Sequence, residues 1–319
     1  MTSARVAEVG DGILRITFPL PFGIDHVHCY ALRRDERGWL VVDTGLGLET
    51  AEALWRSVLD THELRVERIV VTHFHPDHVG AAAPLAELTS APVYEGTLDY
   101  EQCVRVWATE SAPDRLAAYM LEHGLSTADV EQLRTDARRL VSLVRYAPDP
   151  EPLAPSDEID GWEVLHLPGH ADGHVALLRD GVLIAGDALL ATITPNVGLY
   201  PESRPDPLAD YLDSLSRIVE LAPTVALPGH GDTINDPPQR ARELIAHHHE
   251  RLEATRAALR DGRPRTAYEV SLTLFPDPLP PRLRRFALAE TRAHLEHVAL
   301  RGEIIRSAGD GLVRYAVDV

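Results

Sequence analysis

The chain contains no lysine, and all 31 of its basic residues are arginine. Biased codon usage in a GC-rich genome explains this more simply than adaptation to heat. Cysteine is almost as scarce, because only Cys29 and Cys103 occur. Two cysteines in a chain of 319 residues exclude a disulfide framework and favour a reducing compartment. We therefore expect a cytoplasmic protein.

Long apolar runs and excess positive charge are also missing. No segment approaches the roughly 20 apolar residues that span a bilayer, and no basic start followed by an apolar run predicts a signal peptide. The 49 acidic residues outnumber the arginines and give a formal net charge of −18. This charge disfavours a general affinity for nucleic acid or anionic lipid. We expect neither a membrane nor nucleic acid as a partner, and a homo-oligomer is left open.

The order of the predicted elements indicates a layered α/β or α+β domain. Strands are predicted at residues 12–18, 26–34, 39–43, 68–71, 92–95, 163–166, 174–178, 182–185 and 224–227. Helices are predicted at residues 49–59, 78–88, 207–221 and 238–260, and a helical insertion of two or three amphipathic helices at 97–145. The Pro-rich acidic stretch 147–160 predicts a loop.

Residues 263–319 predict a separate module after a domain of residues 1–262. Its order is a helix at 267–274, a Pro-rich turn, a helix at 282–301 and a hairpin of strands 303–306 and 312–316. Helix, turn, helix and hairpin is the order of a winged helix. We expect this small module to pack against the larger domain or against a partner subunit.

Residues 72–78, Thr-His-Phe-His-Pro-Asp-His, place three imidazoles and a carboxylate next to one another after an apolar strand. Histidine and aspartate are good ligands for divalent metals of intermediate hardness. A strand that ends at Val71 directs His73 and His75 to the same side, because side chains repeat every two residues. Asp77 and His78 then begin a helix and point to a neighbouring position. The stretch predicts two adjacent metal positions.

Three further islands each place a ligand where a strand gives way to a loop. His170 and His230 both follow Leu-Pro-Gly, and Asp187 follows Ala-Gly. The neighbouring glycines allow the backbone to approach a metal closely. The complete set of candidate metal ligands is His73, His75, Asp77, His78, His170, Asp187 and His230.

This set resembles the ligand set of the metallo-β-lactamase-fold hydrolases, and Asp43 in Val-Val-Asp-Thr-Gly matches the first motif of that family. The resemblance covers about residues 12–235 and implies a four-layer αββα sandwich with the metals at one edge. It also implies that Asp187 bridges two metals and that Asp43 orients a ligand. The first metal would be held by His73, His75 and His170, and the second by Asp77, His78 and His230. The module 263–319 resembles a winged-helix extension found in one branch, which includes acyl-thioester hydrolases and an endoribonuclease.

Two divalent cations in such a site lower the pKa of a shared water toward neutrality and supply hydroxide. One metal then polarises a carbonyl or phosphoryl oxygen while the hydroxide attacks, and Asp77 and His230 are placed to move protons as candidate catalytic residues. Zinc fits the nitrogen and oxygen ligands best, although manganese, iron and cobalt accept the same set. We expect a hydrolase of a small acyl substrate with an ester-like carbonyl, a thioester or lactone; the alternative is a phosphodiesterase or endoribonuclease.

Residues beyond the ligands leave two interpretations open. Four large side chains of the helical insertion either line an acyl pocket or bury their helices: Tyr100, Trp107, Tyr119 and Met120. The loop 192–200 either contacts the substrate through Asn196, Gly198 and Tyr200 or is only structural. Three basic residues either begin a solvated helix or bind nucleic acid: Arg282, Arg284 and Arg285.

Five histidines outside the ligand set predict no site. His26 and His28 point the same way on a strand, and we expect a packing or surface role for them. The consecutive histidines 247–249 fan around a helix axis and cannot converge on one ion. They predict a solvated helix face.

Overall fold

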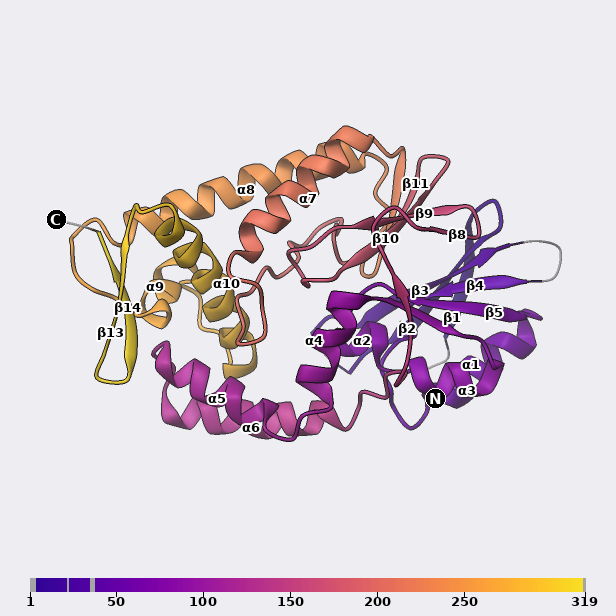
Figure 1. Ribbon diagram of the computed structural model, residues 1–319, viewed down its shortest axis with the longest axis horizontal. Helices are drawn as coiled ribbons and strands as arrows, with labels where there is room; N and C mark the ends of the chain where they lie inside the picture. The colour runs from indigo at the N-terminus through magenta and orange to yellow at the C-terminus, as the bar shows by residue number, and fades with distance from the viewer. Residues whose placement is uncertain (1–3, 22, 35–37, 318–319) are drawn as a thin grey trace.

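Two β-sheets form the core of one half of the molecule, on the right in Figure 1. The computed structural model describes residues 4–21, 23–34 and 38–317, so the outermost residues of the two predicted domain ranges lie outside it. The first sheet follows chain order: β1 (Arg5–Gly10), β2 (Ile13–Pro19), β3 (His26–Arg33), β4 (Trp39–Val42), β5 (Val66–Val71), β6 (Val93–Gly96) and β7 (Glu151–Leu153). The strands from β1 to β4 pair antiparallel, whereas those from β4 to β7 pair parallel because helices cross between them.

The second sheet has the strand order β12-β11-β10-β9-β8. Its members are β8 (Glu158–Ile159), β9 (Trp162–His166), β10 (Val175–Arg179), β11 (Val182–Gly186) and β12 (Val225–Pro228). Pairing is antiparallel from β8 to β11, and β12 pairs parallel with β11 after the crossover helix α7 (Pro207–Leu221). This parallel pair brings the carboxyl ends of two ligand-bearing strands side by side.

Alternating side chains build the core in layers. Tyr30 and Val164 belong to the cluster between the two sheets, while their neighbours Cys29 and Leu165 belong to clusters on the outer faces. The outer face of the first sheet is covered by α1 (Ala51–Thr61) and α3 (Ala82–Thr89), and that of the second by α7 and α8 (Pro237–Ala257). The period of two along each strand therefore produces a mixed α/β sandwich with helices on both sides.

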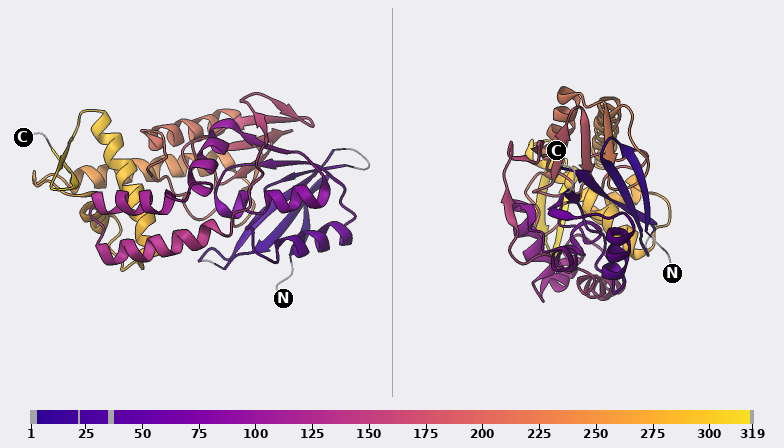
Figure 2. Two further views of the ribbon diagram at one scale, coloured as in Figure 1. Left: turned by 60° about the horizontal axis from the view of Figure 1, so that its bottom comes forward. Right: turned by 90° about the vertical axis from the view of Figure 1, so that its right-hand side faces the viewer.

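The helical insertion consists of α4 (Thr97–Trp107), α5 (Ala112–Glu122) and α6 (Thr127–Val141). The C-terminal module contains α9 (Ala267–Leu274), α10 (Pro281–Leu300) and the hairpin of β13 (Ile305–Gly309) and β14 (Leu312–Ala316), in the predicted order. Helices α5, α6 and α10 share a buried apolar cluster, so the insertion and the module lie side by side at one end of the molecule (Figures 1 and 2). None of the described helices is both long and apolar enough to cross a bilayer.

The structure corrects the predicted elements in two regions. The helix predicted at 78–88 is split into α2 (Pro76–Val79) and α3. A Cβ atom on Gly80 would lie 2.1 Å from the carbonyl oxygen of Pro76 and 2.7 Å from the backbone nitrogen of Gly47, so only glycine permits this close turn. The predicted loop 147–160 contains β7 and β8, and β1 precedes the first predicted strand. These short edge strands are created by pairing with their neighbours and carry no clear local pattern.

Candidate metal centre

The seven candidate ligands lie at the ends of strands from both sheets. Asp187 follows β11 directly, and His230 comes two residues after β12 ends at Pro228. His73 and His75 follow β5, and His170 lies in the loop between β9 and β10. Asp77 and His78 occupy the short helix α2, in which Pro76 is the first residue. The sandwich therefore brings together residues that are up to about half the chain apart.

Their ligand atoms form three overlapping groups. Within each group the candidate nitrogen and oxygen atoms all lie within 4.8 Å of one another. The groups are His73, His75 and His170; His73, His78 and Asp187; and Asp77, His78 and His230. All seven predicted ligands thus converge, with Asp187 in the middle group.

The carboxylate of Asp187 faces ligands on two sides. Its Oδ2 atom lies 3.6 Å from Nε2 of His170 and 3.4 Å from Nε2 of His230. Its Oδ1 atom lies 3.6 Å from Nε2 of His78. On one side, Nε2 of His73 lies 3.0 Å from Nδ1 of His75. On the other side, Nε2 of His230 lies 3.4 Å from Oδ2 of Asp77.

Several of these atoms are buried without a partner. Among the described residues, Nε2 of His78, Nε2 of His170 and Oδ1 of Asp187 have no hydrogen-bond partner. Leaving a buried polar atom unsatisfied costs about 1–3 kcal/mol, and cations bound in the neighbouring ligand groups would satisfy these atoms. Imidazole nitrogens and carboxylate oxygens are the ligands of first-row divalent metals. The residues present therefore fit divalent metal ions.

The second ring nitrogen of three histidines is held by the protein. Nδ1 of His170 lies 2.9 Å from the carbonyl oxygen of Asn196, and Nδ1 of His230 lies 2.7 Å from that of His26. A carbonyl oxygen only accepts, so each ring must donate from Nδ1, and in the neutral ring the lone pair stays on Nε2. Nδ1 of His78 lies 2.8 Å from Oδ2 of Asp43 and is oriented in the same way.

Asp43 is itself tightly constrained. Its Oδ1 atom accepts hydrogen bonds from the backbone N–H of Thr72 at 2.8 Å and from the Thr72 hydroxyl at 3.0 Å. Its φ angle is +63°, in the left-handed region that aspartate tolerates better than most residues. Asp43 therefore links the end of β4 to the ligand loop after β5 and contacts His78, the kind of role that the resemblance implied for it.

The carboxylates dominate the electrostatics of one half of the site. Burial lowers the pKa of His230, but the charges of Asp187 and Asp77 outweigh it and raise that pKa to about 10. Burial likewise opposes protonation of His78, and Asp187 and Asp43 raise its pKa well above the ordinary value. The carboxylates that raise these two pKa values give this half of the site a negative charge. The same charge attracts a divalent cation, which would replace the protons on His78 and His230.

In the other half of the site burial decides the charge state. Burial lowers the pKa of His73 and His75 well below the ordinary histidine value, and it lowers the pKa of His170 as well. These three rings are therefore neutral near pH 7, which is the form in which histidine binds metal.

The Pro-Gly-His motif at residue 230 has a packing reason. A Cβ atom on Gly229 would lie 2.4 Å from Oδ1 of Asp187 and 2.7 Å from Cε1 of His78. Any larger residue would push apart the two ligands that meet there, so glycine is required at this position.

His174 is a supporting residue that was not among the predicted ones. Its Nε2 atom accepts a hydrogen bond of 3.1 Å from the backbone N–H of Asp187, and its ring stacks on that of His73 with centroids 4.9 Å apart. His174 thus supports two candidate ligands from behind. The second histidine of Pro-Gly-His-Ala-Asp-Gly-His was the available signal for it.

His26 and His28 have the packing role expected of them. Nε2 of His26 accepts from the backbone N–H of Gly231 at 3.1 Å, and Nε2 of His28 lies 2.9 Å from the Gly231 carbonyl oxygen. Together with the His26 carbonyl, these contacts hold the loop that carries His230. The pairing is invisible in the sequence because about 200 residues separate the partners.

The large residues of the helical insertion have different positions. Trp107 reaches the ligand loop, where its Nε1–H donates to the carbonyl oxygen of Phe74 at 2.8 Å. Tyr119 and Met120 are buried in the cluster shared with α10, which agrees with the packing interpretation. Tyr100 donates its hydroxyl to the carbonyl oxygen of Pro148.

Two other predicted surface groups are partly internal. Arg284 is buried and donates to the carbonyl oxygens of Phe275 and Asp277, so it is not part of an open basic patch. The prediction of a wholly solvated face for histidines 247–249 is wrong at His248, which is fully buried and stacks on His294 of α10. Consecutive residues fan around a helix, so one of the three faces inward.

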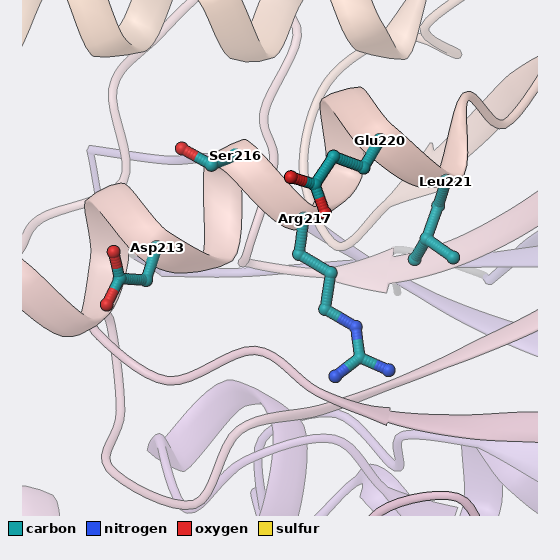
Figure 3. Close-up of a pocket in the computed structure, with 5 residues that line it drawn as sticks. All are labelled: Asp213, Ser216, Arg217, Glu220 and Leu221. Carbon is teal, nitrogen blue, oxygen red and sulfur yellow. The ribbon is translucent and has the colours of Figure 1, made fainter.

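A surface pocket elsewhere contains none of the candidate ligands. It lies along α7 and is lined by Asp213, Ser216, Arg217, Glu220 and Leu221, all from that helix (Figure 3). None of these lining residues belongs to the three candidate ligand groups.

Residues 22–230 match the family model of the Metallo-beta-lactamase superfamily. The chain belongs to the metallo-beta-lactamase superfamily. Residues 252–318 match a second model, the C-terminal domain of metallo-beta-lactamase-like proteins. The C-terminal module is therefore a feature shared with other superfamily members.

Full-length relatives support this assignment. The chain is 28% identical to the probable metallo-hydrolase YqjP of Bacillus subtilis, over 96% of this chain and 97% of the relative. It is similar to a crystal structure of a metallo-beta-lactamase family protein from Thermus thermophilus, with 37% identity, a TM-score of 0.84 and coverage of 98% and 100% of the two chains. A beta-lactamase domain protein from Burkholderia ambifaria gives 33% identity, a TM-score of 0.88 and coverage of 98% and 94%. The chain is a metal-dependent hydrolase of this superfamily.

Proposed function

We propose that the protein is a dinuclear hydrolase that cleaves the ester-like carbonyl of a small acyl substrate, a thioester or a lactone. The proposal depends on one observation above all. Buried ligand atoms without partners, on His78, His170 and Asp187, all point into overlapping groups of nitrogen and oxygen ligands.

The proposal assigns each of the seven candidate ligands to one of two metal ions or to both. His73, His75 and His170 would hold the first ion, and Asp77, His78 and His230 would hold the second. Asp187 would serve both, since its Oδ2 lies 3.6 Å from Nε2 of His170 and its Oδ1 lies 3.6 Å from Nε2 of His78. Zinc suits this mixture of nitrogen and oxygen, and iron or manganese accept the same ligands.

When bound, two such cations lower the pKa of a water molecule toward neutrality and polarise a carbonyl oxygen. The protein residues hold the site in a reactive geometry. Asp43 and the carbonyl oxygens of Asn196 and His26 orient imidazoles, and Asp77 and His230 are the candidates for moving protons. In the metal-free site Nε2 of His230 lies 3.4 Å from Oδ2 of Asp77 and can share a proton with it, which an ion bound to both atoms would displace.

An acyl substrate is favoured over a phosphodiester. A similar protein from Alkalilimnicola ehrlichii, 29% identical over 67% of this chain, is named a hydroxyacylglutathione hydrolase. Another from Aspergillus fumigatus, 22% identical over 65% of this chain, is named an atrochrysone carboxyl ACP thioesterase. The net charge of −18 and the internal position of Arg284 both disfavour an RNA substrate.

The C-terminal module is proposed to have a winged-helix arrangement and to serve packing, with the domain boundary near residue 262. A cytoplasmic location is proposed because both cysteines are free and buried.

The test compares Asp187→Ala with Asp213→Ala, which removes an exposed carboxylate of α7 (Figure 3). We expect the first variant to lose both metal equivalents and all turnover, and the second to retain them, as measured by elemental analysis and assays. The wild-type protein is assayed against acyl thioesters, lactones, phosphodiesters and single-stranded RNA. RNA cleavage without thioester or lactone turnover would overturn the proposed substrate class, and full metal content in Asp187→Ala would overturn the bridging role.

A further inference from the structure

A chain of contacts connects the metal centre to the C-terminal module. The carbonyl oxygen of Asn196 accepts from Nδ1 of His170 at 2.9 Å. The side chain of the same asparagine donates from Nδ2 to Oε2 of Glu290 on α10 at 3.1 Å, and to the carbonyl oxygen of Phe286 at 3.4 Å. One residue therefore touches a candidate ligand through its backbone and the module through its side chain.

The rest of this loop is seated on the same helix. The backbone N–H of Leu199 donates to the carbonyl oxygen of Ala289 at 3.0 Å, and its carbonyl oxygen accepts from the hydroxyl of Tyr119 in α5. A Cβ atom on Gly198 would lie 3.1 Å from Cβ of Ala289. The loop is thus packed closely against both the C-terminal module and the helical insertion.

The carboxyl group of Glu290 is buried and makes few polar contacts. Its side chain is 7% exposed, and among the described residues Asn196 is its hydrogen-bond partner. No arginine among the residues that the structure describes forms an ion pair with Glu290. A buried carboxyl group with a single partner is costly for folding, so its position opposite Asn196 calls for a functional explanation.

We propose that Glu290 is a positioning residue for the metal centre, which acts through Asn196 to hold the carbonyl oxygen that orients His170. The proposal rests on the proposed function only in taking His170 as a metal ligand. The C-terminal module then completes the metal centre without supplying a ligand. Outer partners of ligand histidines typically change metal affinity by about 10–100-fold.

The experiment uses the metal-free full chain titrated with Co²⁺, with absorption spectra and chelator competition as readouts. Glu290→Leu removes the acceptor, and Glu290→Gln keeps an oxygen for the Asn196 amide. We expect Glu290→Leu to weaken one of two cobalt equivalents by about 10–100-fold and to change its spectrum, while the other equivalent binds as in the wild type. Glu290→Gln is expected to restore both properties.

A second variant separates positioning from general damage to α10. Asn196→Ala keeps the backbone carbonyl and leaves α10 unsubstituted, but it removes the amide contacts with Glu290, the Phe286 carbonyl oxygen and the Tyr200 hydroxyl. We expect it to weaken the same cobalt equivalent at least as much as Glu290→Leu, and the double variant to be no worse than Asn196→Ala, because both break the same chain of contacts.

The outcomes are distinct. Tight binding of both equivalents with an unchanged spectrum in Glu290→Leu and Asn196→Ala would overturn the proposal, as would additive effects or equal weakening of both equivalents. If Glu290→Leu does not fold, Asn196→Ala decides alone. Because the readout is cobalt binding, a wrong substrate class leaves this test unaffected, whereas a wild type that binds no metal would contradict the proposed function itself.

Discussion

At the residue scale, the candidate ligand histidines depend on contacts directed away from the position where metals would bind. His78 illustrates this, because one ring nitrogen faces Asp187 and the other contacts Asp43. Asp43 is shared between His78 and the two donors of Thr72. A carboxylate can accept from all of these groups, whereas an amide has one oxygen and two N–H donors. The charge and symmetry of Asp43 are therefore needed at this position.

We predict that Asp43→Asn lowers metal affinity by about 10–100-fold. Asparagine tolerates the left-handed φ angle of +63°, so the backbone is preserved and the loss reports the contact with His78. Asp180→Asn is a matched control, because Asp180 is an exposed turn residue with a φ angle of +50°. Chelator competition measures the affinity, and equal affinities in the two variants would contradict the orienting role.

At the element scale, β6 and α4 meet at a buried acidic corner. Glu95 lies in β6 and Asp99 in the first turn of α4, with exposures of 1% and 0%. Among the described residues no donor reaches any of their four carboxyl oxygens. Burial raises the pKa of Glu95, although contact with Asp99 opposes this, and burial and the Glu95 charge raise the pKa of Asp99. The junction of the two elements is therefore more stable when at least one of the pair is protonated.

This corner predicts a dependence of stability on pH. A carboxyl group whose pKa is raised in the folded state binds its proton more tightly there than in the unfolded chain. Its stabilising effect is present at low pH and is lost as the pH rises above the ordinary carboxyl pKa, about 4. In Glu95→Gln the amide N–H can donate to Asp99 at any pH in this range, whereas Glu95 must first bind a proton. The free energy of unfolding of the variant, relative to that of the wild type, should therefore increase from pH 5 to pH 8.

Denaturant unfolding of the metal-free proteins at each pH measures this difference. Glu101→Gln, an exposed substitution on the same helix, provides the control and should track the wild type. A Glu95→Gln variant whose relative stability stays constant across this range would contradict the protonation of this pair in the folded protein.

At the scale of the whole molecule, the metal centre lies where two sheets, the helical insertion and the C-terminal module meet. The protein carries a net charge of −18, and Asp43, Asp77 and Asp187 concentrate part of it at one buried point. Without a cation these carboxylates are balanced only by protonated His78 and His230, and several ligand atoms stay unsatisfied. Metal binding should therefore stabilise the entire fold and not only the loops that carry the ligands.

We predict that removal of metal by a chelator lowers the melting temperature, and that Zn²⁺, Mn²⁺ or Co²⁺ restores it in a concentration-dependent way. A ligand at 100 times its dissociation constant stabilises the folded state by about 2.7 kcal/mol. Mg²⁺ should restore much less, because it prefers oxygen ligands and this site is rich in imidazole nitrogen. An unchanged melting temperature after metal removal, or equal rescue by Mg²⁺, would contradict the proposed site.

The helices and strands that carry strong local patterns were predicted well from the sequence. The bounds of α7, α9 and β14 agree with the predicted ranges, and the strands before the ligand loops end within a residue or two of their predicted ends. The edge strands β1, β7 and β8 were missed because they are short and exist only through pairing with neighbouring strands. The burial of His248 was missed for a similar reason, because the sequence pattern of α8 does not show which of its faces packs against α10.

The candidate ligands could be named from the sequence alone, because metal binding requires particular residue types, and here they follow directly after predicted strands. The residues that hold those ligands in place became visible only in the folded protein. The contacts of His230 with His26, of His78 with Asp43 and of Asn196 with Glu290 join residues 204, 35 and 94 positions apart. No local pattern encodes such pairs, because they arise when strands, insertion and module pack around the same edge of the sandwich.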